Sequence, residues 1–493
     1  MHHFNKINMK NSTYLKLLTL ALGFTLFTSC EEDLLVEPKD SINEIDFLNN
    51  PNNAITLVNG VYNKQLDFEM YSFSWIGITS ITSDDADKGS SLSDSGADKN
   101  KLDNLSFDAN DISFREVWQG RYEGIGRANN ALFYLEQLQI QEILKNRLIG
   151  ETKFLRALYY FDLVRCFGGV PIVTAKIDIN DSELINQVVF NRKTKQETYT
   201  QIENDLLDAI EKLPLKGQYT SNDTGRASKG AAQALLAKVY LYQNKWQEAF
   251  DMSGMVIGSG QYGLLANYED VWRELGENKT ESIYEIQCSA GNAMRAYSYI
   301  QAPRGTPDLG WGFNTPSVSL ENAYEPNDLR KAATILYSDT ALWDGFPSSA
   351  GWSNPRYNYK SYHSSISESW NGDREQTGKN LRILKYSDIL LIRAEAALNM
   401  GNSTEALEKV NMIRVRAGLE ELTAITMDQL LHERRLEMAM EHDRWFDLVR
   451  TGKAFSAMAA NGKTFVVGVH ELFPIPQNEI ILSDGLLTQN PGY

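Results

Sequence analysis

Two stretches of the chain repeat the same pattern of small and large residues, and this repeat most limits how the chain can fold. Ala237 and Ala249 are 12 residues apart, and Ala394 and Ala406 repeat that spacing. Small residues let paired helices approach closely, while large residues fill the groove between them. Each stretch is therefore predicted to fold as a pair of packed helices. We expect Ala237 and Ala394 at close helix contacts, and Lys238 to be exposed.

The first stretch matches the tetratricopeptide spacing of large, small, aromatic and small residues at Leu236, Ala237, Tyr240 and Ala249. Helix pairs of this kind bury their faces against neighbouring pairs, so more than two units are expected. Candidate pairs, the third of which overlaps the second, lie at residues 112–167, 196–243, 228–257 and 385–417.

Much of the remaining chain also has helical periodicity. Residues 151–167 carry apolar side chains at helical spacing, and Gly168-Gly169 before Pro171 ends that helix. Further helices are predicted at 112–138, 196–213, 228–243, 246–257, 385–400, 403–417 and 427–450. The chain is therefore predicted to be mainly α, with a tetratricopeptide-type helical repeat scaffold over about residues 40–290 and 380–493.

An irregular segment interrupts this scaffold. Between Pro303 and Lys379 the periodicity disappears, and Gly, Pro, Ser and Asn become frequent. Aromatic residues are dense here: 13 fall between Tyr297 and Trp370, including four of the nine tryptophans. We predict an aromatic-rich loop insertion with short strands over about residues 291–379, called the loop region below. Residues 80–104, rich in Ser, Asp and Gly, are predicted to form a second surface loop.

The N-terminus has the features of an export signal. An apolar run over residues 17–27 follows two lysines and is shorter than the roughly 20 residues of a membrane span. The run ends in small residues and Cys30, where a bacterial lipoprotein has its acylated thiol, although Phe27 departs from the usual aliphatic residue. The alternative is an ordinary secretory signal that contains a cysteine. We interpret residues 1–29 as a lipoprotein signal peptide, Cys30 as the lipidated residue, and residues 30–493 as a single lipid-tethered domain.

The charge and cysteine content exclude several classes of protein. The chain has 48 Lys and Arg against 64 Asp and Glu, a net charge of -16, which repels nucleic-acid phosphate and anionic lipid headgroups. Besides Cys30, only Cys166 and Cys288 are present. These two can form at most one disulfide, so the fold does not depend on a disulfide framework. Cys166 lies in an apolar helical pattern and is predicted to be a buried thiol.

One group of carboxylates suggests catalysis. Glu433, Glu437 and Glu441 are spaced by four and would share one face of the predicted helix, with several arginines nearby. Two carboxylates held roughly 5–10 Å apart can hydrolyse a glycosidic bond. Arginine neighbours, however, lower the proton affinity of a carboxylate, which does not suit a general acid. We therefore interpret this group as a salt-bridge network.

Other catalytic and metal-binding patterns are weak or absent. The chain has no His-x-x-x-His or Cys-x-x-Cys spacing, no Gly-x-Ser-x-Gly elbow and no phosphate-binding glycine loop. The acidic residues 83–87 could hold a calcium ion through their oxygens, but the remaining ligands of a known calcium loop are missing. We interpret this segment as a solvated acidic loop, and we expect no enzyme activity, metal or cofactor.

An ordered set of motifs resembles the SusD/RagB family of outer-membrane lipoproteins. These motifs extend over essentially all of residues 30–493, and their order is more specific than any one of them. They lie at residues 127–131, 154–161, 167–171, 225–227, 413–418, 433–437, 444–450, 473–476 and 489–493.

The resemblance implies both a fold and a role. Members of this family have a tetratricopeptide-based helical scaffold that carries a variable loop region. The implied role is non-catalytic binding of an oligo- or polysaccharide at the cell surface and its delivery to a SusC-like TonB-dependent transporter. The implied location is the outer membrane, lipid-anchored and facing the extracellular side. Alternatives are a peptide ligand, a surface glycoside hydrolase, or a scaffold that binds a protein partner.

The aromatic residues of the irregular segments are the candidate binding residues. Tryptophans in periodic helices, such as Trp118, Trp246 and Trp445, are expected in the core. In the loops a flat ring can instead cover the apolar face of a sugar, and about 50 Å² of contact contributes on the order of 1 kcal/mol. The alternative is that these rings pin the loops to the scaffold. The predicted ligand-binding residues are Trp75, Tyr297, Tyr299, Trp311, Trp343, Trp352 and Trp370.

Overall fold

The computed structural model describes residue 50 and residues 52–493, apart from residues 92, 95, 97, 179, 290, 292 and 293. The predicted signal peptide and Cys30 lie outside these residues. Residues 51–493 fold as one unit, and no helix among the described residues is long and apolar enough to cross a membrane.

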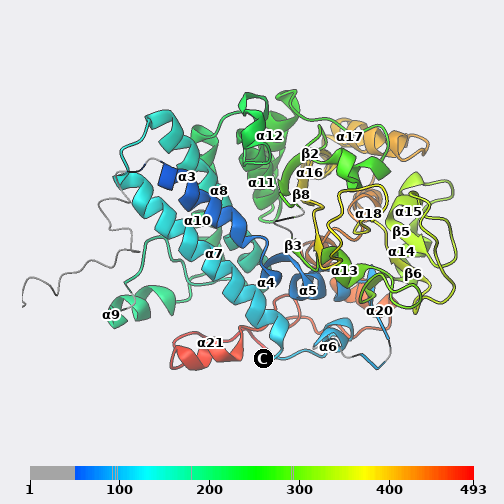
Figure 1. Cartoon of the computed structure of the whole chain (residues 1–493), viewed down its shortest axis with the longest axis horizontal. Helices are drawn as coiled ribbons and strands as arrows, with labels where there is room; N and C mark the ends of the chain where they lie inside the picture. Colours follow the sequence, from blue (N-terminus) through cyan, green and yellow to red (C-terminus); the bar gives the residue numbers. More distant parts are fainter. Residues whose placement is uncertain are drawn as a thin grey trace, which may run out of the picture. The chain divides into compact units, whose positions relative to one another are not determined.

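The unit is mainly helical, as predicted, and its longer helices pack in chain order. α7 packs on α8, α8 on α10, α10 on α11, α11 on α12, α12 on α16, and α16 on α17. The predicted helix pairs over 228–257 and 385–417 are therefore direct neighbours, although the loop region separates them in sequence (Figure 1). The bounds are α3 Asn52–Lys64, α7 Ile112–Gln137, α8 Glu142–Phe167, α10 Lys195–Lys212, α11 Lys229–Leu241, α12 Trp246–Gly258, α16 Tyr386–Asn399 and α17 Ser403–Arg416.

The close packing at the repeated alanines is confirmed, but the exposure of Lys238 is not. Ala237 and Ala394 are fully buried in the main hydrophobic core. Lys238 is also buried, and its Nζ lies 2.6 Å from a carboxylate oxygen of Asp443 and 3.0 Å from one of Asp388. The two carboxylates offset the free-energy cost of removing the ammonium from water, so a lysine can lie inside this helix stack.

The single helix predicted over 427–450 is wrong. The structure has two helices, α18 (Met427–Glu437) and α19 (Arg444–Arg450). In the turn between them Met440 and His442 have φ values of +64° and +70°, which are incompatible with a right-handed helix. Glu441 lies in this turn, so the three glutamates do not share one helix face.

The surface loop predicted over 80–104 is also wrong in part. β1 (Ala86–Gly89) pairs antiparallel with β4 (Phe313–Pro316), and the residues just before β1 are buried. Asp84 accepts hydrogen bonds of 2.7 and 2.8 Å from Arg444, and Asp85 accepts one of 2.7 Å from Arg435. The guanidinium groups allow these carboxylates to be buried, so the segment is not a solvated acidic loop.

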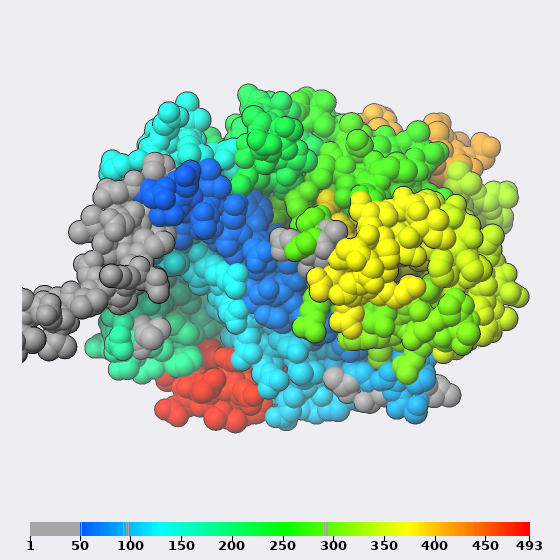
Figure 2. All heavy atoms as spheres, viewed as in Figure 1, coloured from blue at the N-terminus to red at the C-terminus, as the bar shows by residue number. Residues whose placement is uncertain are grey.

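The loop region consists of short elements, as predicted, and forms the yellow-green to yellow surface on the right of Figure 2. β2 (Ser282–Ile286) and β8 (Leu381–Lys385) pair antiparallel, which brings the two ends of the region together at its base. Between them lie β3 Met294–Arg295, α13 Tyr297–Gln301, β4, α14 Val318–Ala323, α15 Leu329–Thr334, β5 Ile335–Tyr337, β6 Arg356–Asn358 and β7 Gln376–Thr377.

Short helices complete the unit. The N-terminal ones, which lie against the loop region, are α4 Phe68–Tyr71, α5 Phe73–Ile76, the π-helix η1 Gly77–Ile81 and α6 Lys99–Asp103. The others are α9 Ser182–Leu184, η2 Ile185–Val189, η3 Lys216–Gln218, η4 Ser221–Asp223, η5 Glu269–Trp272, η6 Glu274–Gly276, α20 Ala454–Ala460 and α21 Gln477–Leu482. Cys166 is a buried free thiol, as predicted.

Candidate functional site

Three aromatic side chains meet where the loop region lies against the N-terminal short helices. The Trp311 ring is edge-on to the Phe73 ring, with centroids 5.6 Å apart, and edge-on to the Tyr299 ring, with centroids 5.9 Å apart. All three side chains are half-buried, so packing holds part of each ring while part remains exposed. Fixed, partly exposed rings of this kind are suited to covering the apolar face of a sugar.

Two glycines bring the Trp311 segment close to α13. A Cβ at Gly310 would lie 2.1 Å from the carbonyl oxygen of Tyr299, and Gly312 has a φ of +73°, in the left-handed region. The amide of Trp311 donates a hydrogen bond of 2.9 Å to the same Tyr299 carbonyl. Because glycine lacks a Cβ, it permits both the close approach and the turn. The glycines therefore fix Trp311 beside Tyr299.

A shallow pocket of about 20 Å³ also contains Tyr299 in its wall, together with Phe346, His363, Trp370 and Arg374. The His363 and Trp370 ring centroids are 6.1 Å apart, and the Arg374 guanidinium lies 5.6 Å from the Trp370 ring. A cavity of this size holds about one water molecule. A sugar would therefore lie across these side chains rather than inside an enclosed hole.

Polar groups at this surface can pair with sugar hydroxyls. The Arg374 side chain makes no hydrogen bond or ion pair with any described residue, so its donors are available to a ligand. Burial, together with the carboxylates of Asp308 and Glu375, raises the pKa of Tyr299, which therefore stays a neutral hydroxyl at physiological pH. The rings and these donors and acceptors together make a candidate binding surface, called the aromatic platform below.

Two of the predicted binding residues face the interior. Trp75 is only 4% exposed, and the Arg121 guanidinium lies 4.2 Å from its ring. The Tyr297 hydroxyl is 2.9 Å from Nε2 of His442, and burial raises the pKa of Tyr297. His442 is itself buried, which lowers its pKa to about 3, and its Nδ1 is 3.0 Å from the Thr79 hydroxyl. We therefore leave Trp75 and Tyr297 out of the aromatic platform.

Two predicted tryptophans lie outside the aromatic platform. Trp352 is 6% exposed, and its indole Nε1 donates a hydrogen bond of 2.9 Å to the Pro307 carbonyl. Trp343 is 37% exposed, but the Arg273 guanidinium lies 5.0 Å from its ring and it does not line the shallow pocket. The structure thus brings together Tyr299, Trp311 and Trp370, with Tyr299 between the other two.

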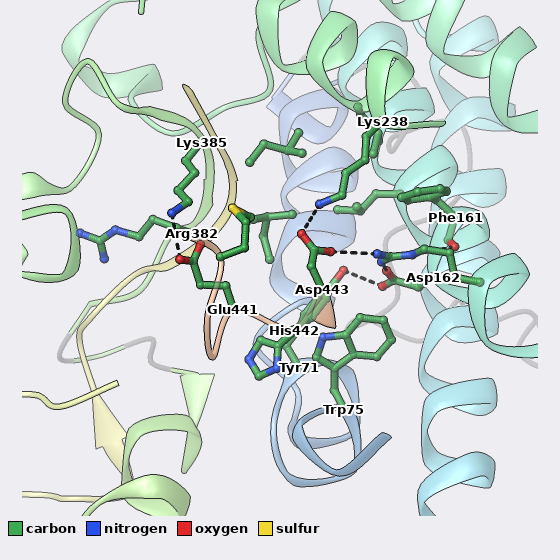
Figure 3. A pocket seen from close by; sticks show the side chains of 16 residues that line it. Tyr71, Trp75, Phe161, Asp162, Lys238, Arg382, Lys385, Glu441, His442 and Asp443 are labelled. Atoms are coloured by element: carbon green, nitrogen blue, oxygen red, sulfur yellow. Dashed lines mark hydrogen bonds and ion pairs between the residues drawn. The ribbon is translucent and has the colours of Figure 1, made fainter. Parts of the chain in front are cut away.

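A second cavity lies between Trp75 and the scaffold (Figure 3). Its volume is about 40 Å³, which holds a few water molecules and excludes a sugar ring. Its charged groups are already paired: Asp443 accepts from Lys238 at 2.6 Å and Arg165 at 3.4 Å, and Lys385 lies 2.8 Å from Glu441. This cavity is a buried polar junction rather than a ligand pocket.

The glutamates that suggested catalysis are paired with cations. Glu433 lies 2.5 Å from Arg330, Glu437 lies 2.6 Å from Arg416, and Glu441 lies 2.6 Å from Lys360. Burial alone would raise the pKa of Glu437, but Arg416, Lys385 and Arg330 hold it well below its usual value. A carboxylate that stays ionised cannot act as a general acid, which supports the salt-bridge interpretation.

One group of carboxylates is close enough to bind a metal ion. Oxygens of Asp67, Glu69 and Glu123 lie within 4.8 Å of one another. The Lys64 ammonium already lies among them, at 2.9, 2.6 and 2.6 Å respectively. The lysine supplies the positive charge that a metal ion would otherwise bring.

Sequence reasoning missed several residues of the aromatic platform. Phe73 lies outside the loop region, and its contact with Trp311 joins segments far apart in the chain. His363, Phe346 and Arg374 lie inside the region, but nothing in their spacing distinguished them from their neighbours. The density of aromatic residues located the surface but not its members.

Comparison with known proteins gives consistent results. A sequence model of the SusD family matches residues 280–493, and one described as starch-binding and associating with the outer membrane matches residues 53–241. The chain is 31% identical to a laminarin-binding SusD-like protein, with a TM-score of 0.77, covering 90% of this chain and 100% of that one.

Two further relatives agree. Surface glycan-binding protein A of Bacteroides thetaiotaomicron, solved with laminarihexaose, is 25% identical, with a TM-score of 0.76, covering 89% of this chain and 99% of that one. SusD-like protein P38 of Formosa agariphila is 27% identical over 505 residues, covering 92% of this chain and 94% of that protein. The laminarin-binding protein and surface glycan-binding protein A are named for binding a glycan, not for an enzyme activity. The chain belongs to the SusD family, as a non-enzymatic member.

Proposed function

We propose that this chain binds an oligo- or polysaccharide at the cell surface through its aromatic platform. The observation that carries the proposal is that Tyr299 contacts Trp311 and also lines the shallow pocket of the loop region together with Trp370. The relatives solved with or named for laminarin have the same fold, which makes a β-glucan such as laminarin the first ligand to test.

The platform accounts for an affinity that suits capture and release. Each ring contributes on the order of 1 kcal/mol when it covers a sugar face. Three rings with hydrogen bonds to Arg374 and Tyr299 give a dissociation constant between about 1 mM and 1 μM. An open surface also fits a polymer, because chain ends need not enter a closed pocket.

We further propose that the bound glycan passes to a SusC-like TonB-dependent transporter, with the chain anchored to the outer membrane through Cys30. Family membership and the outer-membrane association named for the matching family support this arrangement. The apolar run ending at Cys30 supports lipid attachment and an extracellular position. A Cys30→Ala variant should fold but no longer fractionate with outer membrane or incorporate labelled lipid. A wild-type chain that takes up no lipid would contradict the anchor.

The binding surface is tested by single substitutions. Trp311→Ala and Trp370→Ala should each weaken laminarin binding by about fivefold to tenfold in isothermal titration, because each removes one ring. Phe455→Ala is the matched control, since Phe455 is an exposed aromatic residue of α20 in the scaffold. Wild-type affinity in both tryptophan variants would exclude the aromatic platform. Failure of the wild type to bind any glycan would exclude the function.

A reducing-sugar assay separates binding from hydrolysis. The chain should release no sugar from a glycan that it retains, because Glu433, Glu437 and Glu441 are all committed to ion pairs. Activity that survives repurification would instead support the hydrolase alternative.

A further inference from the structure

We propose that a third cavity, walled by α18, α19 and α20, binds a small molecule through a carboxylate or sulfate group. Its volume is about 340 Å³, within the range of roughly 300–1,000 Å³ that ligand pockets have. Its lining includes no Phe, Tyr or Trp, so it is chemically unlike the aromatic platform. The proposal does not depend on glycan binding at that platform.

Three helices and the buried acidic segment form the walls. α18 contributes Asp428, Leu431, His432 and Arg435, whose spacing places them on one helix face. Arg444 and Asp447 of α19, Ala460 of α20, and Asp84 and Ser319 from outside these helices also line the cavity. Because helices carry most of these side chains, the cavity is a rigid feature of the scaffold.

Two arginines are held in fixed positions with one edge free. Arg435 donates from Nε to Asp85 at 2.7 Å and from Nη2 to the Ser319 hydroxyl at 2.9 Å. Arg444 donates from Nε and Nη2 to Asp84 at 2.7 and 2.8 Å. Nη1 of Arg435 and Nη1 of Arg444 donate no hydrogen bond to any described residue. Their side chains are 13% and 16% exposed, so the free edges remain open to a ligand.

The acceptors around these arginines are already occupied. Asp84 accepts from Arg444 with both oxygens, and Asp447 accepts from Arg434 and from Arg450. At the rim, Asp428 accepts from Lys453 at 2.9 Å with one of its oxygens. Around the two arginines the cavity therefore offers hydrogen-bond donors in excess of free acceptors. A ligand rich in acceptors and carrying negative charge matches this excess, because guanidinium groups bind carboxylate and sulfate oxygens with short, directed hydrogen bonds.

Asp84 and Asp85, which accept hydrogen bonds from the two arginines, determine how such a ligand would bind. They offset much of the positive charge of Arg435 and Arg444, so the cavity attracts anions weakly at long range. Recognition therefore depends on the direction of the free Nη1 donors. We expect millimolar affinity for a single anionic group.

The test uses the purified chain with glucuronate and sulfate as probes and glucose as the neutral control. Ala460 is exposed and lines the cavity, so Ala460→Trp should fill the cavity without disturbing the core. Ala459→Trp is the matched control, because Ala459 is exposed on the same helix and does not line the cavity.

Isothermal titration should show glucuronate and sulfate binding at least about tenfold more tightly than glucose. Ala460→Trp should lose this binding, whereas Ala459→Trp and Trp311→Ala should keep it. Equal binding of glucose would overturn the oxyanion assignment. Unchanged binding in Ala460→Trp, lost binding in Trp311→Ala, or no binding to the wild type would overturn the site.

A second variant tests the free donors. Arg444→Lys keeps the positive charge beside Asp84 but removes the planar Nη1 edge, so it should weaken glucuronate binding by about tenfold. Glucuronate affinity equal to that of the wild type, in a variant that melts as the wild type does, would show that this edge does not contact the ligand.

Discussion

The helical scaffold and the loop region are built from elements of different length. In the scaffold, α7 and α8 are each 26 residues long, and charged residues lie inside the helix stack as matched ion pairs. In the loop region the strands are two to four residues long, and one of its apolar clusters is made of leucines and aromatic rings. Long helices packed on neighbours leave few side chains free, whereas short elements leave some rings half-exposed. This difference is why we expect stability to depend mainly on the scaffold and propose that binding takes place at the loops.

One buried network of ion pairs shows how the helices of the scaffold are joined. Arg434 is almost fully buried and lies 2.6 Å from Asp388 and 2.8 Å from Asp447. These carboxylates belong to α16 and α19, so one guanidinium joins three helices. In the loop region, the buried guanidinium of Arg330 pairs with Asp328 at the start of its own helix, α15, and with Glu433 and Glu437 of α18, so it joins two helices.

The largest expected effect comes from removing that guanidinium. Arg434→Met should lower the free energy of unfolding by about 3–5 kcal/mol, because it leaves buried carboxylates without a partner. Lys453→Met is the control: its ion pair with Asp428 is exposed and should contribute less than about 1 kcal/mol. Urea denaturation measures the free energy of unfolding of both variants. Equal losses in the two variants would show that burial of the network does not stabilise the scaffold.

The sequence predicted most of the scaffold, and its failures have local causes. Alanine spacing and the Gly168-Gly169 stop located helices that the structure confirms. The first nine residues of α8 were missed although Leu144 and Leu148 are four residues apart; Leu148 is buried there, but Ile143 is exposed. The break after α18 was missed because Met440 and His442, not glycine or proline, adopt the left-handed conformation. Only tertiary contacts favour that turn.

The loop region offers a direct comparison between a buried and a half-exposed tryptophan. Trp352→Ala should cost about 3 kcal/mol of stability, because it empties a buried site and leaves the Pro307 carbonyl without its donor. Trp311→Ala should cost about 1 kcal/mol or less, since its ring is only half-buried. Melting curves measure the stability of the two variants, and titration with laminarin measures their binding. Loss of binding with full stability in Trp352→Ala would make Trp352 a ligand contact after all.

A smaller effect is expected from overpacking a repeat contact. Ala237→Leu should cost about 1–3 kcal/mol, because Ala237 is fully buried between α11 and its neighbours. Ala459→Leu makes the same change at an exposed helical position and should alter stability by about 0.5 kcal/mol or less. Lys238→Leu cannot serve as the control, because Lys238 lies in the buried ion network. Similar melting temperatures for the two alanine variants would contradict the close helix contact.

The binding surface was harder to predict than the fold. An aperiodic, aromatic-rich segment indicated where rings gather; in the structure Tyr299 contacts Trp311 and shares a pocket wall with Trp370, and their role in binding stays a prediction. Whether a ring is free depends on neighbours from distant segments: Arg121 of α7 covers Trp75, and Pro307 accepts from Trp352. Sequence composition contains no information on such pairings, so it identifies the region but not the exposed rings.

The smallest expected effect lies at the junction of the two regions and depends on pH. Glu277 accepts a hydrogen bond of 2.7 Å from the amide of Asn380, where the loop region rejoins the scaffold, and burial raises its pKa to about 7. The folded chain therefore holds this proton more tightly than the unfolded chain, whose glutamates ionise near 4.5. The contribution of this proton to the free energy of unfolding of the wild type is fully present below about pH 4.5 and is lost as the pH rises to about 7.

Glu277→Gln should remove that loss, because glutamine cannot ionise and its carbonyl oxygen can still accept from the Asn380 amide. The free energy of unfolding of the variant should equal that of the wild type near pH 4.5 and exceed it at pH 8 by on the order of 1 kcal/mol. Part of the gain is offset because Arg382, 3.5 Å away, loses a negative neighbour. Glu408→Gln, at an exposed position of α17, should show no pH-dependent difference. Urea denaturation at both pH values gives the comparison, and a gain confined to low pH would reverse the sign argued for Glu277.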